Sequence, residues 1–133
     1  MLKKVEIGQK FSHIAKNTFR GCYSLESITI PRDMGSIYTA AFYECFSLIT
    51  IVMPPNISQI GSDSFTYCYS LKTVALNKTG SIYSNAFYDC RSLKKLIIPK
   101  EYYISSYACR YCYSISKATI PSTSTTIPAG LFE

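Results

Sequence analysis

One phrase of 22 or 23 residues recurs along this chain of 133 residues, and it constrains the fold more than any other feature. The phrase is complete at residues 41–54, which read Ala-Phe-Tyr-Glu-Cys-Phe-Ser-Leu-Ile-Thr-Ile-Val-Met-Pro. A leucine slot, an aromatic slot and a cysteine slot keep nearly constant distances in successive copies. A fixed period in this range is typical of a solenoid, in which each unit buries its apolar face only against its neighbours.

The repeat divides residues 1–133 into units of a single solenoid domain. The units begin near Leu2, Leu25, Leu48, Leu71, Leu93 and Ile115. The aromatic slot holds Phe19, Phe42, Phe65, Phe87, Cys109 and Phe132. Neither end shows the polar capping unit that solenoids usually need for solubility. We therefore expect a fragment, a module of a longer protein, or a solenoid whose uncapped end units are tolerated.

Each unit predicts two short extended segments. It opens with Leu-x-x-Ile-x-Ile, as in residues 25–30, and side chains two apart along a strand point to the same side, here inward. Proline then ends the ladder in four units, at Pro31, Pro54, Pro99 and Pro121. A second inward position predicts a strand on the opposite wall: Ile14, Ile37, Ile60, Ile82, Ile104 and Ile127. The stretch from the aromatic slot to the cysteine slot suits one helical or 3₁₀ turn.

This phrase resembles the BspA-like (Treponema-type) leucine-rich repeat family, whose units read roughly A-F-x-x-C-x-S-L-x-x-I-x-I-P. The resemblance covers Leu2 to Phe132, with departures at Asn77, Cys109 and Ala118. It implies a repeat solenoid: a right-handed leucine-rich-repeat superhelix of about six coils, β-dominated, with parallel strands and short helical or 3₁₀ turns. It also implies a cell-surface or secreted adhesion module. The chain shows no signal peptide or anchor, so a cytoplasmic location stays open.

Five cysteines share one register, which predicts a column of buried thiols, because free cysteine behaves as a small apolar residue. They are Cys22, Cys45, Cys68, Cys90 and Cys112. Cys109 and Cys112 also spell C-x-x-C, a spacing found in zinc and redox sites. A zinc site needs two more ligands, and His13, the only histidine, lies about four repeats away. We therefore expect no metal and no cofactor.

The bulk properties suit a folded, basic protein without obvious catalytic groups. The chain is 47% hydrophobic and 17% charged, with a formal net charge of +6. Residues 67–133 carry eight Lys/Arg against three Asp/Glu, which favours anionic partners. One histidine, scattered carboxylates and the lack of a phosphate-binding glycine loop indicate that the protein is not an enzyme. No segment approaches the roughly 20 apolar residues of a membrane helix, so we expect no membrane insertion.

The outward residues of the first strands form columns when the units are stacked, and these columns supply the candidate ligand-binding face. Lysines without acidic neighbours in the same columns lie beside an apolar strip. The candidate residues are Ile49, Val52, Lys72, Ala75, Lys94, Lys95, Ile97 and Lys117. Lysines about 5 Å apart repel by roughly 1 kcal/mol even in water, so the cluster points to a ligand. The alternative is an ordinary solvated strand face whose lysines discourage aggregation.

Three function classes remain open. The first is a non-enzymatic binding or adhesion module whose strand face takes a protein or polysaccharide, with an anionic one favoured by the lysines. The second is a structural spacer or assembly segment of a larger repeat protein, with end-to-end self-association. The third and least supported is nucleic-acid binding by the basic C-terminal half.

Overall fold

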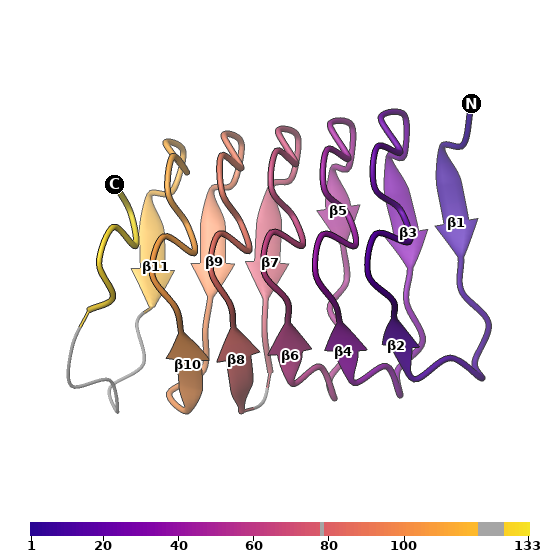
Figure 1. Cartoon of the computed structure of the whole chain (residues 1–133), viewed down its shortest axis with the longest axis horizontal. Coiled ribbons are helices and arrows are strands. Elements are labelled where there is room, and N and C mark those ends of the chain that lie inside the picture. Colours follow the sequence, from indigo (N-terminus) through magenta and orange to yellow (C-terminus); the bar gives the residue numbers. More distant parts are fainter. Residues whose placement is uncertain (78, 120–126) are drawn as a thin grey trace.

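The computed structural model describes residues 1–77, 79–119 and 127–133, and over these ranges the chain winds as a right-handed solenoid (Figure 1). Each of the first five coils contributes one strand to each of two walls, and the sixth contributes β11 to the first wall. Successive coils advance along the long axis from the N-terminus to the C-terminus. The predicted repeat solenoid with parallel strands is therefore confirmed.

The first wall is built from the Leu-x-x-Ile-x-Ile segments. Its strands are β1 (Lys4–Glu6), β3 (Ser27–Thr29), β5 (Thr50–Ile51), β7 (Thr73–Ala75), β9 (Lys95–Ile97) and β11 (Lys117–Thr119). They pair in parallel, in the register that the repeat predicts, as two three-stranded sheets, β1-β3-β5 and β7-β9-β11. The ladder is interrupted between β5 and β7, where the Lys72 N–H donates to the Ile49 carbonyl oxygen at 3.2 Å.

The second wall is one continuous five-stranded parallel sheet. Its strands are β2 (His13–Ile14), β4 (Ser36–Ile37), β6 (Gln59–Ile60), β8 (Gly80–Ile82) and β10 (Tyr102–Ile104). The predicted inward isoleucine of each of these strands is buried. The prediction is wrong for Ile127, which is 68% exposed and lies in no strand among the described residues. Pro121 lies outside the described residues.

The core between the walls consists of columns of equivalent side chains. The rings of Phe19, Phe42, Phe65 and Phe87 stack in sequence, with centroids 5.3, 5.1 and 5.3 Å apart. Three of these rings are fully buried, whereas Phe19 at the end of the stack is half-buried. Each coil thus covers the next, and the terminal coils are covered on one side only.

The segment from the aromatic slot to the cysteine slot does not form the helical or 3₁₀ turn that we expected. Each coil instead makes two overlapping turns. In the second coil, the N–H groups of Tyr43 and Cys45 donate to the carbonyl oxygens of Ala40 and Phe42. Ala40 and Glu44 lie in the left-handed region, with φ of 54° and 61°. A right-handed helix needs consecutive negative φ values, so this alternation excludes one.

Candidate ligand-binding face

Strand alternation positions the candidate side chains on the outer face of the first wall. In β9, Lys95 and Ile97 are exposed on either side of the buried Leu96. Leu96 is held inward by the packed core, so its two neighbours must point to solvent. The same alternation holds in β7, where Thr73 and Ala75 flank the buried Val74.

The structure brings the four candidate lysines together on β7, β9, β11 and the residues that lead into them. Lys94 follows Lys72 in one column, because its N–H donates to the Lys72 carbonyl oxygen at 2.9 Å. Lys95 lies directly opposite Lys117 in the ladder. All four side chains are exposed, and none takes part in an ion pair within the described part of the chain. The cluster is therefore an uncompensated positive surface.

The predicted apolar strip lies beside these lysines but is not continuous. Ala75 is paired with Ile97, which is 37% exposed, so these two are neighbours on the face. Ile49 is joined to Lys72 through the backbone and is also exposed. Val52 is 79% exposed but lies beyond the end of β5, where the ladder is interrupted. Sequence register could not predict this interruption, because the third unit keeps the same phrase as its neighbours.

A shallow hollow of about 310 Å³ lies on this face between β9 and β11. Lys95, Ile97 and Lys117 line it together with Leu96 and Thr119. Cationic and apolar residues therefore meet at a concave site. Such a combination can hold a carboxylate, sulfate or phosphate group next to an apolar one.

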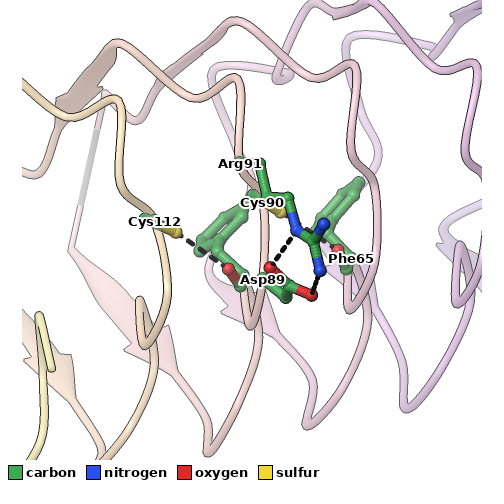
Figure 2. A network of polar contacts seen from close by, with 6 residues as sticks. Phe65, Asp89, Cys90, Arg91 and Cys112 are labelled. Atoms are coloured by element: carbon green, nitrogen blue, oxygen red, sulfur yellow. Dashed lines mark hydrogen bonds and ion pairs between the residues drawn. The ribbon is translucent and has the colours of Figure 1, made fainter.

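Sequence reasoning missed a regular role of the cysteine column. Four of its five thiols each donate a hydrogen bond to the backbone carbonyl oxygen of the aromatic-slot residue in the preceding coil. The bonds run from Cys45 to Phe19 (3.1 Å), from Cys68 to Phe42 (3.2 Å), from Cys90 to Phe65 (3.2 Å) and from Cys112 to Phe87 (3.0 Å). Figure 2 shows the last two. The predicted thiol column is thus present, and it also satisfies backbone acceptors.

Burial keeps the central thiols protonated. It raises the pKa of Cys45 to about 12 and raises the pKa of Cys68 well above its ordinary value. All six cysteines are free thiols in the structure. No group of three or more His, Cys, Asp or Glu side chains among the described residues could hold a metal ion.

The aromatic residues that directly follow the cysteines of the first three coils form a stacked column. Tyr23, Phe46 and Tyr69 stack with centroids 5.0 and 5.2 Å apart. Arg91 continues the column: its guanidinium lies 4.8 Å from the Tyr69 ring centroid and pairs with both carboxylate oxygens of the buried Asp89, at 2.7 and 2.9 Å (Figure 2). These contacts show rings packing on one another from coil to coil.

No segment of the described residues is a helix long and apolar enough to cross a membrane. The described residues contain strands and turns but no helix.

Comparisons with known proteins agree with the fold. The sequence profile of the BspA type leucine rich repeat region matches residues 1–103 in six copies. No curated protein matches the sequence. Among solved structures, a Treponema pallidum leucine rich repeat protein is similar over 88% of this chain and 69% of its own, with 23% identity and a TM-score of 0.69.

Two further solved structures are similar over the whole or nearly the whole chain. A leucine-rich repeat protein from Eubacterium ventriosum has a TM-score of 0.73 and 22% identity over 100% of this chain and 43% of its own. A leucine rich cell surface protein from Faecalibacterium prausnitzii has a TM-score of 0.59 and 21% identity, over 98% and 45%. The chain thus spans less than half the length of these two proteins. At these identities the likeness shows the fold alone.

Proposed function

This chain belongs to the BspA-type leucine-rich repeat family, and from that premise we propose that it is a non-enzymatic binding module whose first-wall face takes an anionic partner. Proteins of this repeat class typically mediate protein interactions. An acidic protein segment is therefore the leading partner, and an anionic polysaccharide is the second. The cell-surface protein among the structural relatives supports a surface or secreted setting for this adhesion role.

The observation that carries the proposal is the group of four exposed lysines without acidic partners beside exposed aliphatic side chains. Mutual repulsion makes such a group unfavourable in the free protein, and a bound anion relieves it. The neighbouring Ile97 and Ile49 add apolar surface that a purely electrostatic polymer site does not need. Acidic protein segments with apolar residues fit both features.

The proposal is tested with a variant in which Lys72, Lys94, Lys95 and Lys117 are all changed to Ser. Surface-immobilised protein is offered polyglutamate, heparin and single-stranded DNA at about 50 and about 150 mM salt. The Debye screening length is roughly 8 Å at the higher salt and more than 10 Å at the lower salt, so electrostatic binding is stronger at the lower salt. We expect polyglutamate to bind more tightly at low salt and the variant to lose most of this binding.

The matched control changes four basic residues in the connecting turns to Ser and keeps the same net charge as the test variant. These residues are Lys10, Lys16, Arg32 and Lys100. We expect the control to retain binding. Equal losses in the two variants would show a general charge effect and reject the face. Retention of heparin or DNA binding alone would replace the protein partner with a polysaccharide or a nucleic acid.

A second candidate function, end-to-end assembly, is supported by the apolar residues at the two ends of the solenoid. Leu2 is 52% exposed and Phe132 is 43% exposed, although both occupy core slots of the repeat. Stacking of one end on another would cover them as neighbouring coils cover the central residues. Sedimentation velocity over a wide concentration range tests this: we expect concentration-dependent growth, and a strict monomer at high concentration contradicts it.

A further inference from the structure

We propose that Cys109 and Cys112 form a redox-active dithiol, which a low-molecular-weight disulfide oxidises to an intramolecular disulfide. This site lies at the end of the cysteine column and shares only Lys117 with the proposed binding face.

The two cysteines belong to one tight turn. The Cys112 N–H donates to the Cys109 carbonyl oxygen at 3.3 Å, which closes a turn of the β type. The Cα atoms at the ends of such a turn lie within 7 Å, and disulfides form at Cα separations of about 4.4–6.8 Å. The equivalent pair one coil earlier, Phe87 and Cys90, is wholly buried on both sides, so both side chains of this turn point into the same core.

Only this coil offers a second thiol. In the described earlier coils the position of Cys109 is occupied by a phenylalanine of the stacked column, which cannot react with the cysteine beside it. Hydrogen bonds from Cys109 and Cys90 lower the pKa of Cys112, and the bond to Cys112 raises the pKa of Cys109. On losing its proton, Cys112 gives up the bond that its thiol donates to the Phe87 carbonyl oxygen and accepts from Cys109 instead. The pair therefore has one sulfur disposed to attack and one protonated sulfur in reach of it.

The attacking sulfur is accessible. Cys109 is wholly buried, but Cys112 is only half-buried and lines an open hollow of about 420 Å³ together with Ile115, Ala118 and Phe132. Lys117 also lines this hollow, and its positive charge favours the approach of an anionic reagent. Cys112 is the last cysteine of the register, and Figure 2 shows it one coil beyond Cys90.

Cys22 supplies an internal control at the other end of the same column. It too is half-buried and lines a hollow, of about 200 Å³. Its turn pairs it with Phe19 instead of a thiol, and burial raises the pKa of Cys22. Cys22 and Cys112 are therefore similarly accessible, but their pKa values are shifted in opposite directions. Comparing their reactivity separates the effect of the dithiol from that of exposure.

The reaction consumes one disulfide RSSR and releases two thiols RSH. The Cys112 thiolate attacks one sulfur of RSSR, which breaks the S–S bond, forms a mixed disulfide on Cys112 and releases RS⁻. The Cys109 thiol then gives its proton to RS⁻ or to solvent and attacks Cys112 Sγ, so that the second RS⁻ leaves and takes up a proton. The two cysteines lose two electrons and two protons, which the reagent gains.

The experiment treats the full chain with oxidised glutathione at pH 7, alkylates the remaining thiols and maps the products by peptide mass spectrometry. We expect the Cys109–Cys112 peptide to lose two hydrogens and to return to the dithiol with excess reduced glutathione. We expect Cys112 to react at least about tenfold faster than Cys22, since one pKa unit changes the thiolate fraction tenfold.

Variants distinguish the dithiol from a merely accessible thiol. Cys109→Phe supplies the phenylalanine found in the other coils and removes the second thiol; we expect the reaction to stop at a glutathione adduct on Cys112. Cys109→Ala serves the same purpose if the larger ring perturbs the turn. Cys22→Ser leaves the dithiol reaction unchanged.

Three results would overturn the inference: equal reactivity of Cys22 and Cys112, a stable glutathione adduct on Cys112 in the native chain, or a disulfide that joins Cys112 to Cys90 instead of Cys109.

Discussion

At the scale of single residues, the core slots differ in whether polar atoms placed in them find a partner. The cysteine slot supplies a donor for a backbone carbonyl oxygen in coil after coil, as from Cys68 to Phe42 at 3.2 Å. The slot just before the aromatic residue is filled by Ala41, Ala86 and Ala108, but Ser64 occupies it in the third turn. Ser64 is wholly buried and its hydroxyl oxygen has no hydrogen-bond partner.

Ser64→Ala is expected to raise the free energy of unfolding by about 1–3 kcal/mol, the cost of leaving a buried hydroxyl without a partner. Alanine already fits this slot in neighbouring coils, so no new contact is required. Urea unfolding followed by circular dichroism measures the change. The control is Ser84→Ala, which removes a hydroxyl bonded to Ser105 at 2.9 Å and should be neutral or destabilising. A destabilised Ser64→Ala variant would contradict the interpretation.

Tyr102 is a second buried polar residue, and it is satisfied: its hydroxyl donates to the Ile57 carbonyl oxygen at 2.8 Å. Burial raises the pKa of Tyr102 from 10.0 to about 12. Because the protonated form is favoured in the folded state, its stabilising contribution is complete below about pH 10. The contribution is lost as the pH rises through the folded-state pKa of about 12.

Tyr102→Phe should therefore lower the free energy of unfolding by about 1–3 kcal/mol at pH 8, since the buried Ile57 oxygen loses its donor. The variant should also lose less stability than the parent between pH 10 and 12. Urea midpoints at a series of pH values measure both effects. Tyr103→Phe, at an exposed neighbouring position, is the control. Identical pH profiles for Tyr102→Phe and the parent would refute the assignment.

At the scale of the element, strands could be predicted and turns could not. Residues 25–30 predict β3 because inward side chains on a strand recur at every second residue. Ile37 predicts β4 because an isoleucine recurs at this position in every unit of the repeat. The residues with a left-handed backbone could not be predicted, because no residue type marks these positions in every coil. Asn17 and Asp63 suit a positive φ, whereas Ala40 and Tyr107 do not. The i, i+3 spacing alone is shared by helices and tight turns.

Ala40 is consequently a strained position. Its φ of 54° places Cβ close to the following carbonyl oxygen, a conformation that costs non-glycine residues about 1–2 kcal/mol. Ala40→Gly should raise the free energy of unfolding by up to about 1 kcal/mol once the greater chain entropy of glycine is included. Ala41→Gly is the control, since Ala41 is buried without a positive φ and should only lose stability. Equal destabilisation of both variants would show that strain is absent.

At the scale of the whole molecule, the repeat predicts which residues become neighbours but not how continuous each wall is. The pairing of Lys95 with Lys117 and of Ala75 with Ile97 follows from the period alone. The interruption after β5, which separates Val52 from this group, depends on local backbone geometry that the shared phrase does not encode. The sequence could therefore predict that these lysines lie together. It could not predict their ligand, because the identity of the ligand also depends on the partner molecule.

A stack of coils also distributes stability in a way that a compact core does not, because each coil touches only its two neighbours. Phe65 stacks on both Phe42 and Phe87 and is wholly buried, whereas Phe19 stacks on Phe42 alone and is half-buried. Phe65→Ala should cost about 3–5 kcal/mol, the range for a buried phenylalanine. Phe19→Ala should cost markedly less.

The central substitution should also reduce cooperativity, because it weakens the two interfaces that connect the N-terminal coils to the C-terminal coils. Hydrogen exchange followed by mass spectrometry along the urea transition separates the two halves. In Phe65→Ala we expect peptides from residues 1–50 and 80–119 to lose protection at different urea concentrations, whereas in Phe19→Ala only the first coil should be affected. Simultaneous loss of protection throughout Phe65→Ala would mean that coupling runs through the walls rather than through the stacked rings.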